Sequence, residues 1–226
     1  MNRLKIMKVY FIFWLFVYFI IYSNIEQVQI YFFATLTFNL AVLTMLVLGT
    51  LFILNAAIKL VVLAGTFGAL AYKQSNYEFY LKGIEKIMPP HIAAMFASRK
   101  NAKQLLFSSE EAKDVIEWLE DRFYNQKSYI NFFISTALMI GLLGTFTGLL
   151  TAIDDMGKII LSLSGDIDLG EVIQGFAGPL SGMAVGFGSS LFGVATSVLL
   201  GIKAFILARN QEQLIEGAEG WLKERI

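Results

Sequence analysis

The side chains in this sequence that could form a functional site are hydroxyls. They lie inside two long apolar stretches, 128–153 and 172–202, and neither stretch contains a charged residue. The candidate ion-path residues are Thr145, Thr147, Ser190 and Ser197. Hydroxyl oxygens within a membrane can line a path for a cation. Serine and threonine in spanning helices also commonly bond their own i−4 carbonyl and do nothing else. Both interpretations stay open on the sequence alone.

Glycines accompany these hydroxyls at helical spacing. On a helix Thr145 shares a face with Gly141 and Gly148, and Ser190 shares one with Gly186 and Gly193. The candidate helix-packing residues are Gly141, Gly144, Gly148, Gly178, Gly182, Gly186 and Gly193. A stripe of glycines lets two helix backbones approach closely, and this alone is a sufficient reason for it.

The sequence contains no pattern typical of an enzyme. No Asp, Glu, His, Lys or Arg lies well inside the apolar stretches, and proton relays by side-chain titration need such groups at membrane depth. There is no cysteine, and the single histidine, His91, has no nearby set of metal-ligating residues in the sequence. Nucleophile–base pairs and phosphate-binding loops are also missing from the sequence. We therefore expect no catalytic residue, no metal site, no resident cofactor and no nucleic-acid partner.

Composition places the chain in a membrane. Hydrophobic residues make up 56% of 226 and charged residues only 16%, against about 25% in soluble domains. Four uncharged runs stand out, at 9–22, 27–58, 128–153 and 172–202. About 20 apolar residues cross the hydrocarbon core, so the last three are long enough, whereas the first needs Lys8 to extend its side chain to the lipid headgroups. A signal peptide over 1–23 is the alternative, which the lack of a small-residue cleavage site disfavours.

The distribution of positive charge predicts the topology, because cytoplasmic segments carry an excess of Lys and Arg. Residues 1–8 and 73–127 are rich in them, while 154–171 is mainly acidic. We expect a cytoplasmic N-terminus at 1–8, spans at 9–22, 30–58, 128–153 and 172–202, a periplasmic turn at 23–29, a cytoplasmic helical region at 59–127, a periplasmic acidic loop at 154–171 and a cytoplasmic C-terminal helix at 203–226. The fold class is thus an all-α integral membrane protein with four transmembrane helices whose long helices extend into a cytoplasmic domain.

Local signals predict helices in the cytoplasmic region. Residues 60–72 are expected to continue the second span, although a short re-entrant segment is the alternative, and Pro89-Pro90 should end the preceding helix. Ser108 and Glu111 have the spacing of a capping box. The apolar face that follows consists of Val115, Trp118, Leu119 and Phe123. One helix is therefore expected to run from 109 through the third span. The C-terminal helix reaches the last residue, which is compatible with a longer tail.

Two segments resemble a known family. The sequence GLLGTFTGLL at 141–150 resembles the third-span signature of the MotA/TolQ/ExbB proton-channel family, and 182–194 resembles the fourth-span signature of its flagellar-stator branch. Four-span relatives in phage defence, of the ZorA type, are similar in the fourth-span pattern and have equal weight as an interpretation. The resemblance implies a ring of five subunits in the bacterial inner membrane. It also implies Thr145 and Ser190 as path residues, although serine replaces the commoner threonine at Ser190 and Thr147 replaces an apolar residue.

The resemblance further implies a partner. A pair of single-span proteins similar to MotB, TolR or ExbD would pass through the ring and bring the membrane aspartate that this chain lacks. The leading hypothesis is an ion-channel or stator subunit of a rotary motor driven by H+ or Na+, with lipid as its surroundings and both termini in the cytoplasm. The alternative is a non-conducting tetraspan membrane scaffold, in which the glycines only hold helices together.

Overall fold

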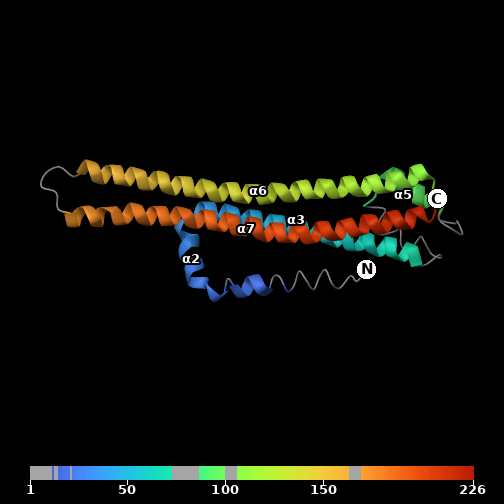
Figure 1. The fold of residues 1–226 in the computed structure, drawn as a ribbon, viewed down its shortest axis with the longest axis horizontal. Helices are drawn as coiled ribbons and strands as arrows, with labels where there is room; N and C mark the ends of the chain where they lie inside the picture. The colour runs from blue at the N-terminus through green and yellow to red at the C-terminus, as the bar shows by residue number, and fades with distance from the viewer. Residues whose placement is uncertain (1–11, 13–14, 21, 73–86, 100–105, 163–168) are drawn as a thin grey trace. The chain divides into compact units, whose positions relative to one another are not determined.

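The computed structural model describes residues 12, 15–20, 22–72, 87–99, 106–162 and 169–226 (Figure 1). Its helices are α2 (Ile25–Ala34), α3 (Leu36–Tyr72), α5 (Pro90–Ser98), α6 (Ser109–Ser162) and α7 (Leu169–Lys223). No β-strand occurs in these described ranges. The all-helical part of the predicted fold class is therefore confirmed.

Three helices are long and apolar enough to cross a membrane. They are found within Leu36–Gly68, Ser109–Leu161 and Gly175–Lys223. At 1.5 Å per residue the 54-residue α6 extends about 80 Å, well beyond a hydrocarbon core of about 30 Å. Only part of α6 can therefore lie in lipid, and its uncharged part, 128–153, is the part suited to that position. Of the predicted first span at 9–22, the described residues 12, 15–20 and 22 are helical, and the rest lie outside the described ranges.

The chain divides into two compact units. Unit 1 takes its described residues from Leu51–Ile130 and Lys203–Ile226, and unit 2 takes them from Val9–Thr50 and Asn131–Ile202. Unit 1 contains most of the charged residues of the described chain, whereas unit 2 contains the candidate ion-path hydroxyls and the glycines around them.

An aromatic cluster forms the core of unit 1. The ring of Phe107 lies 5.4 Å from that of Phe96 and 5.8 Å from that of Trp221, both in edge-on geometry. Phe67 contacts Trp221 in the same way at 6.0 Å. All four side chains are buried. The cluster joins α3, α5 and α7 to the segment that leads into α6, and edge-to-face aromatic pairs stabilise such a junction beyond their buried area.

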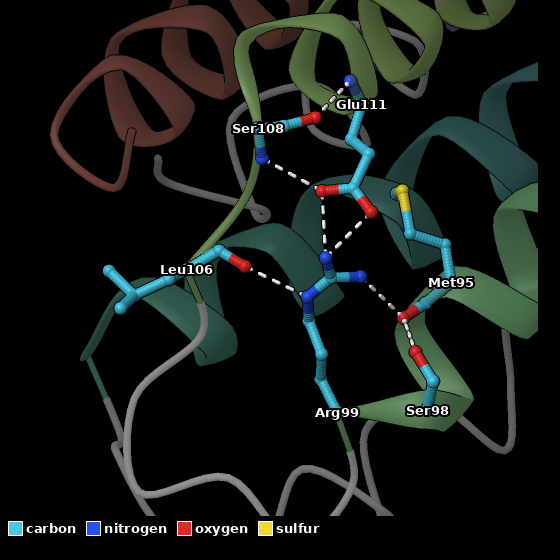
Figure 2. Close-up of polar contacts among 6 residues, drawn as sticks. All are labelled: Met95, Ser98, Arg99, Leu106, Ser108 and Glu111. Carbon is cyan, nitrogen blue, oxygen red and sulfur yellow. Dashed lines mark hydrogen bonds and ion pairs between the residues drawn. The ribbon is translucent and has the colours of Figure 1, made fainter.

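The predicted capping box at the start of α6 is confirmed, and an arginine that the sequence did not indicate completes it (Figure 2). The Glu111 N–H donates to Ser108 Oγ at 3.1 Å, and the Ser108 N–H donates to the Glu111 carboxylate at 2.7 Å. Arg99 Nη2 donates to both oxygens of that carboxylate, at 2.6 and 2.7 Å. Its other nitrogens donate to the carbonyls of Leu106 and Met95. One carboxylate therefore ties the end of α5 to the start of α6.

This arrangement makes the stability of unit 1 depend on pH. Glu111 lies well before the uncharged part of α6, and hydrogen bonds from Arg99 and from the Ser108 backbone hold the pKa of its carboxyl below the ordinary value of 4.5. A carboxyl with a depressed folded-state pKa stabilises the fold above its unfolded pKa, and this contribution is lost as the pH falls through the folded value. We expect the wild-type protein to lose more thermal stability between pH 7 and pH 3 than Glu111→Gln does.

The control for this experiment is Glu110→Gln, since Glu110 is an exposed neighbour in the same helical turn. Its acid sensitivity should match that of the wild type when melting temperatures are recorded across the pH range in detergent. Equal sensitivity of Glu111→Gln and wild type would show that the Arg99 ion pair does not contribute to the fold.

Other predictions for the charged region are also confirmed. Along α6, Val115, Leu119 and Phe123 are buried and Trp118 is half-buried, so the predicted apolar face points into unit 1. The first residue of α5 is Pro90, where a missing N–H is harmless. The prediction that Pro89-Pro90 ends a preceding helix falls outside the described residues. Continuation of the second span through 60–72 is confirmed, because α3 runs unbroken to Tyr72.

Unit 2 contains a helix break inside the range predicted as the second span, 30–58. The helix α2 ends at Ala34 and α3 begins at Leu36. The break leaves carbonyls of α2 without the N–H groups of a continuing helix. The buried Asn39 provides donors in their place, since its Nδ2 donates to the carbonyls of Tyr31 and Phe32 at 3.0 Å each. No periodicity marks this position, because the whole range is apolar.

The acidic segment at 154–171 was predicted as a loop, but its described residues, 154–162 and 169–171, are helical. The helix α6 continues through Ser162, and α7 starts at Leu169. Lys158 Nζ lies 2.6 Å from Asp154 and 3.0 Å from Asp155. Exposed pairs at i,i+3 and i,i+4 support a helix weakly. These pairs give a physical reason for the longer helix.

Candidate functional site: the contact between α6 and α7

Within unit 2, α6 and α7 approach each other backbone to backbone. A Cβ atom placed on Gly141 would lie 2.9 Å from Gly193 Cα and 3.0 Å from the Ser189 carbonyl oxygen. A Cβ on Gly148 would lie 2.7 Å from Gly186 Cα. Backbone atoms cannot move aside as a flexible side chain can, so only glycine fits at these positions. Small residues at a helix interface permit this close van der Waals packing in a membrane.

Ser189 lies in the middle of this contact and is completely buried. A Cβ on Gly144 would overlap the Ser189 side chain, which shows that the serine fills the space left by that glycine. Among the described residues, Ser189 Oγ has no hydrogen-bond partner. On α7 it shares a face with Gly186 and Gly193. Sequence reasoning selected the adjacent Ser190, which the structure places half-buried beside the contact.

Thr145 connects the two helices through its hydroxyl. Thr145 Oγ1 lies 3.1 Å from the carbonyl oxygen of Gly186 on α7 and 3.4 Å from that of Gly141 in its own helix. A hydroxyl has one proton to donate, so the shorter, cross-helix bond is the better of the two. The side chain is half-buried. This hydroxyl is therefore more than a local back-bond, because it bridges two candidate membrane spans.

The other two candidate hydroxyls differ in their bonding. Ser197 Oγ donates across the helices to the carbonyl of Ile134 at 2.9 Å. Thr147 Oγ1 donates within α6 to the Gly144 carbonyl at 2.9 Å, and the residue is exposed. The structure thus brings Thr145 and Ser197 into the α6–α7 contact as donors, whereas Thr147 has the local bond that is common in spanning helices.

The regular glycine spacing on α7 extends beyond the close contact. Among the described residues, a Cβ on Gly182 would meet Ala152 Cβ at 3.9 Å, and a Cβ on Gly178 would have no neighbour within 4 Å. Side chains would fit at both positions within this chain. Of the glycines repeating every four residues, Gly186 has the tightest surroundings, since a Cβ there would lie 3.1 Å from Gly148 Cα.

The contact can present hydroxyl and carbonyl oxygens but has no group that titrates. Its members are glycines, Ser189, Thr145 and Ser197. Over the part of the chain that the structure describes, no cluster of three or more His, Cys, Asp or Glu side chains could hold a metal ion. Any charge that moved along this contact would have to be supplied by an ion or by another protein.

The fold and the site define an all-helical protein with three candidate membrane-spanning helices, two of which meet at a glycine-rich, hydroxyl-bridged contact. The chain therefore has the features of a multi-pass membrane protein. No known protein family matches it, and neither a curated protein nor a solved structure does so.

Proposed function

We propose that this chain is an ion-channel or stator subunit of a rotary motor in a bacterial inner membrane. It would use the proton or sodium motive force together with a single-span partner that carries a membrane aspartate. The observation that supports the proposal is the Thr145 hydroxyl, which lies at a close, charge-free contact between two apolar helices and bonds to Gly186 across it. The resemblance of 141–150 and 182–194 to a proton-channel family agrees with this placement.

The physical basis of the mechanism is the cost of a charge in lipid. A partner carboxylate at membrane depth is costly when ionised and much less so when protonated, so ion binding changes the surroundings that it prefers. Each elementary charge that crosses the membrane releases about 2.3 kcal/mol per 100 mV, several times thermal energy. Five subunits around a pair of partner helices would offer that carboxylate successive equivalent positions. Ion passage would then turn the ring.

In this proposal the topology is completed by 9–22 as the first of four spans. Both termini and the charged region 59–127 would face the cytoplasm, where helices such as the polar part of α6 pass torque to an effector. The exposed apolar side chains of α3, α6 and α7 would face lipid or neighbouring subunits.

A functional test uses the ring reconstituted in liposomes with its aspartate-bearing partner. We expect Thr145→Val to lower ion flux about tenfold, because one hydrogen-bonding group worth about 1 kcal/mol or more is lost at the path while the shape is kept. Ser190→Ala should lower the flux in the same direction. The matched control is Thr44→Val, since Thr44 is exposed and its hydroxyl donates to the Leu40 carbonyl of its own helix. Normal flux in both variants would contradict the assigned path.

The subunit number is an independent test that needs no partner. Native mass spectrometry of the protein in mild detergent should show five copies per particle. A monomer would contradict the proposal, because one chain cannot surround a partner.

A second candidate is a non-conducting membrane scaffold, which one specific observation favours. Thr145 and Ser197 both donate to carbonyls across the α6–α7 contact, so these hydroxyls already have a structural use. For a scaffold, Thr145→Val should lower the melting temperature, and the ring with its partner should conduct no ions at all.

A further inference from the structure

Unit 1 contains a pocket of about 250 Å³ between α3 and α6. The residues that matter for its chemistry are Phe52, Asn55, Lys59, Arg122, Asn125 and Tyr129. Lys59 and Arg122 line the pocket from opposite helices, and among the residues that the structure describes neither Asp nor Glu lines it. The amide side chains of Asn55, Asn125 and Gln126 add further N–H donors. The pocket is therefore suited to an anion with several oxygen acceptors.

Arg122 is held in place from outside the pocket. Its Nη1 donates to the Ile87 carbonyl at 3.0 Å, and its guanidinium lies 5.9 Å from the centre of the Trp118 ring. Within the described residues, the buried Nε has no hydrogen-bond partner. A buried donor left unpaired costs about 1–3 kcal/mol, and an acceptor on a bound ligand would remove that cost.

The pocket lies where two uncharged segments end. Lys59 is the first charged residue after 27–58, and Lys127 is the last before 128–153. The rings of Phe52 and Tyr129, one from each helix, contact each other at 5.6 Å. Aromatic residues of this kind concentrate at the level of lipid headgroups. The positions of these residues therefore indicate that the pocket lies at a membrane–water interface.

We propose that this pocket binds the phosphate of an anionic phospholipid headgroup. Basic pockets between spanning helices are suited to such headgroups. The guanidinium and ammonium groups would neutralise the phosphate, and the amides would bond its remaining oxygens. Exposed apolar side chains on α3, including Leu51 and Leu54, offer a surface for the acyl chains. Free phosphate shares the headgroup chemistry but would gain nothing from that surface. The inference is independent of the motor proposal.

The test measures lipid binding by the full chain in detergent. Native mass spectrometry and thermal shift should show stronger binding of phosphatidylglycerol than of phosphatidylcholine with the same acyl chains. Lys59→Gln should weaken phosphatidylglycerol binding about fivefold, the effect of one basic residue near a charged membrane surface. Lys59→Arg should retain binding because it retains the charge. The matched control is Lys127→Gln, which removes one exposed charge at the same boundary but does not line the pocket.

Three results would overturn the proposal. Equal binding of the two lipids by the wild-type protein would do so, and this comparison needs no variant to fold. An equal loss in Lys127→Gln and Lys59→Gln would show a general charge effect instead of a site. Inorganic phosphate that shifts the melting temperature as much as phosphatidylglycerol at the same concentration would assign the pocket to the free anion.

Discussion

Phe107→Ala is expected to lower the free energy of unfolding by about 3–5 kcal/mol, the usual cost of truncating a buried aromatic side chain. Phe107 is 4% exposed, and its ring contacts Phe96 and Trp221. The Arg99 guanidinium also lies over it, 5.2 Å from the ring centre. The backbone bond from the Phe107 N–H to the Arg225 carbonyl would remain in the variant, so the loss would report the contacts of the side chain, including the one with Arg99.

The control for this variant is Phe205→Ala on α7, because the side chain of Phe205 is 73% exposed. Truncation there removes the same atoms without opening a cavity in unit 1, and its effect should stay within about 0.5 kcal/mol. Chemical unfolding in detergent, followed by tryptophan fluorescence, measures both changes. A similar small change for both variants would mean that the aromatic cluster is not part of a packed core.

The elements that could be predicted from the sequence are those set by local chemistry. Ser108 and Glu111 are three residues apart, and their reciprocal bonds form within one helical turn, so spacing alone identified the start of α6. Proline at position 90 acts through its own ring. The apolar residues that recur at helical spacing, including Val115 and Leu119, mark one face of one helix. None of these requires knowledge of which segments meet in space.

Contacts between segments distant in the sequence could not be predicted in this way. Arg99 pairs with Glu111 across residues that have no regular pattern, and Phe107 precedes the helix, where apolar periodicity is not yet visible. Asn39 lies in a continuous apolar range, and its role depends on a break at Thr35 that no Gly or Pro marks. The pocket that contains Lys59 and Arg122 joins two helices whose register only the structure supplies.

Prediction of the candidate site from the sequence was limited in the same way, at the level of single residues. Glycine spacing identified Gly141 and Gly148 as packing residues, because a four-residue or seven-residue repeat stays on one helical face. Ser189 and Ser190 both lie within a wide face that includes Gly186, so periodicity could not decide which of them meets α6. The choice depends on the rotation of α7 about its axis. The structure turns Ser189 into the contact.

Gly148→Ala is expected to destabilise the protein, because overpacking a site that cannot relax costs about 1–3 kcal/mol. The added methyl group would lie 2.7 Å from Gly186 Cα, which belongs to the backbone of α7. Helix propensity acts in the opposite direction, since alanine favours a helix by about 1 kcal/mol over glycine. The steric cost should therefore be the larger of the two effects, and the melting temperature in detergent should fall.

Gly157→Ala in the same helix is the matched control, because a Cβ on Gly157 would meet no atom of the described residues within 4 Å. Its propensity gain is unopposed, so we expect an unchanged or slightly higher melting temperature. The two alanines should thus act with opposite sign although they are chemically identical and share α6. If Gly148→Ala instead stabilised the protein as Gly157→Ala does, the helices could not be in backbone contact. The Thr145 bond to Gly186, one turn away, would then lose the close approach on which it depends, and the support for an ion path beside it would fail.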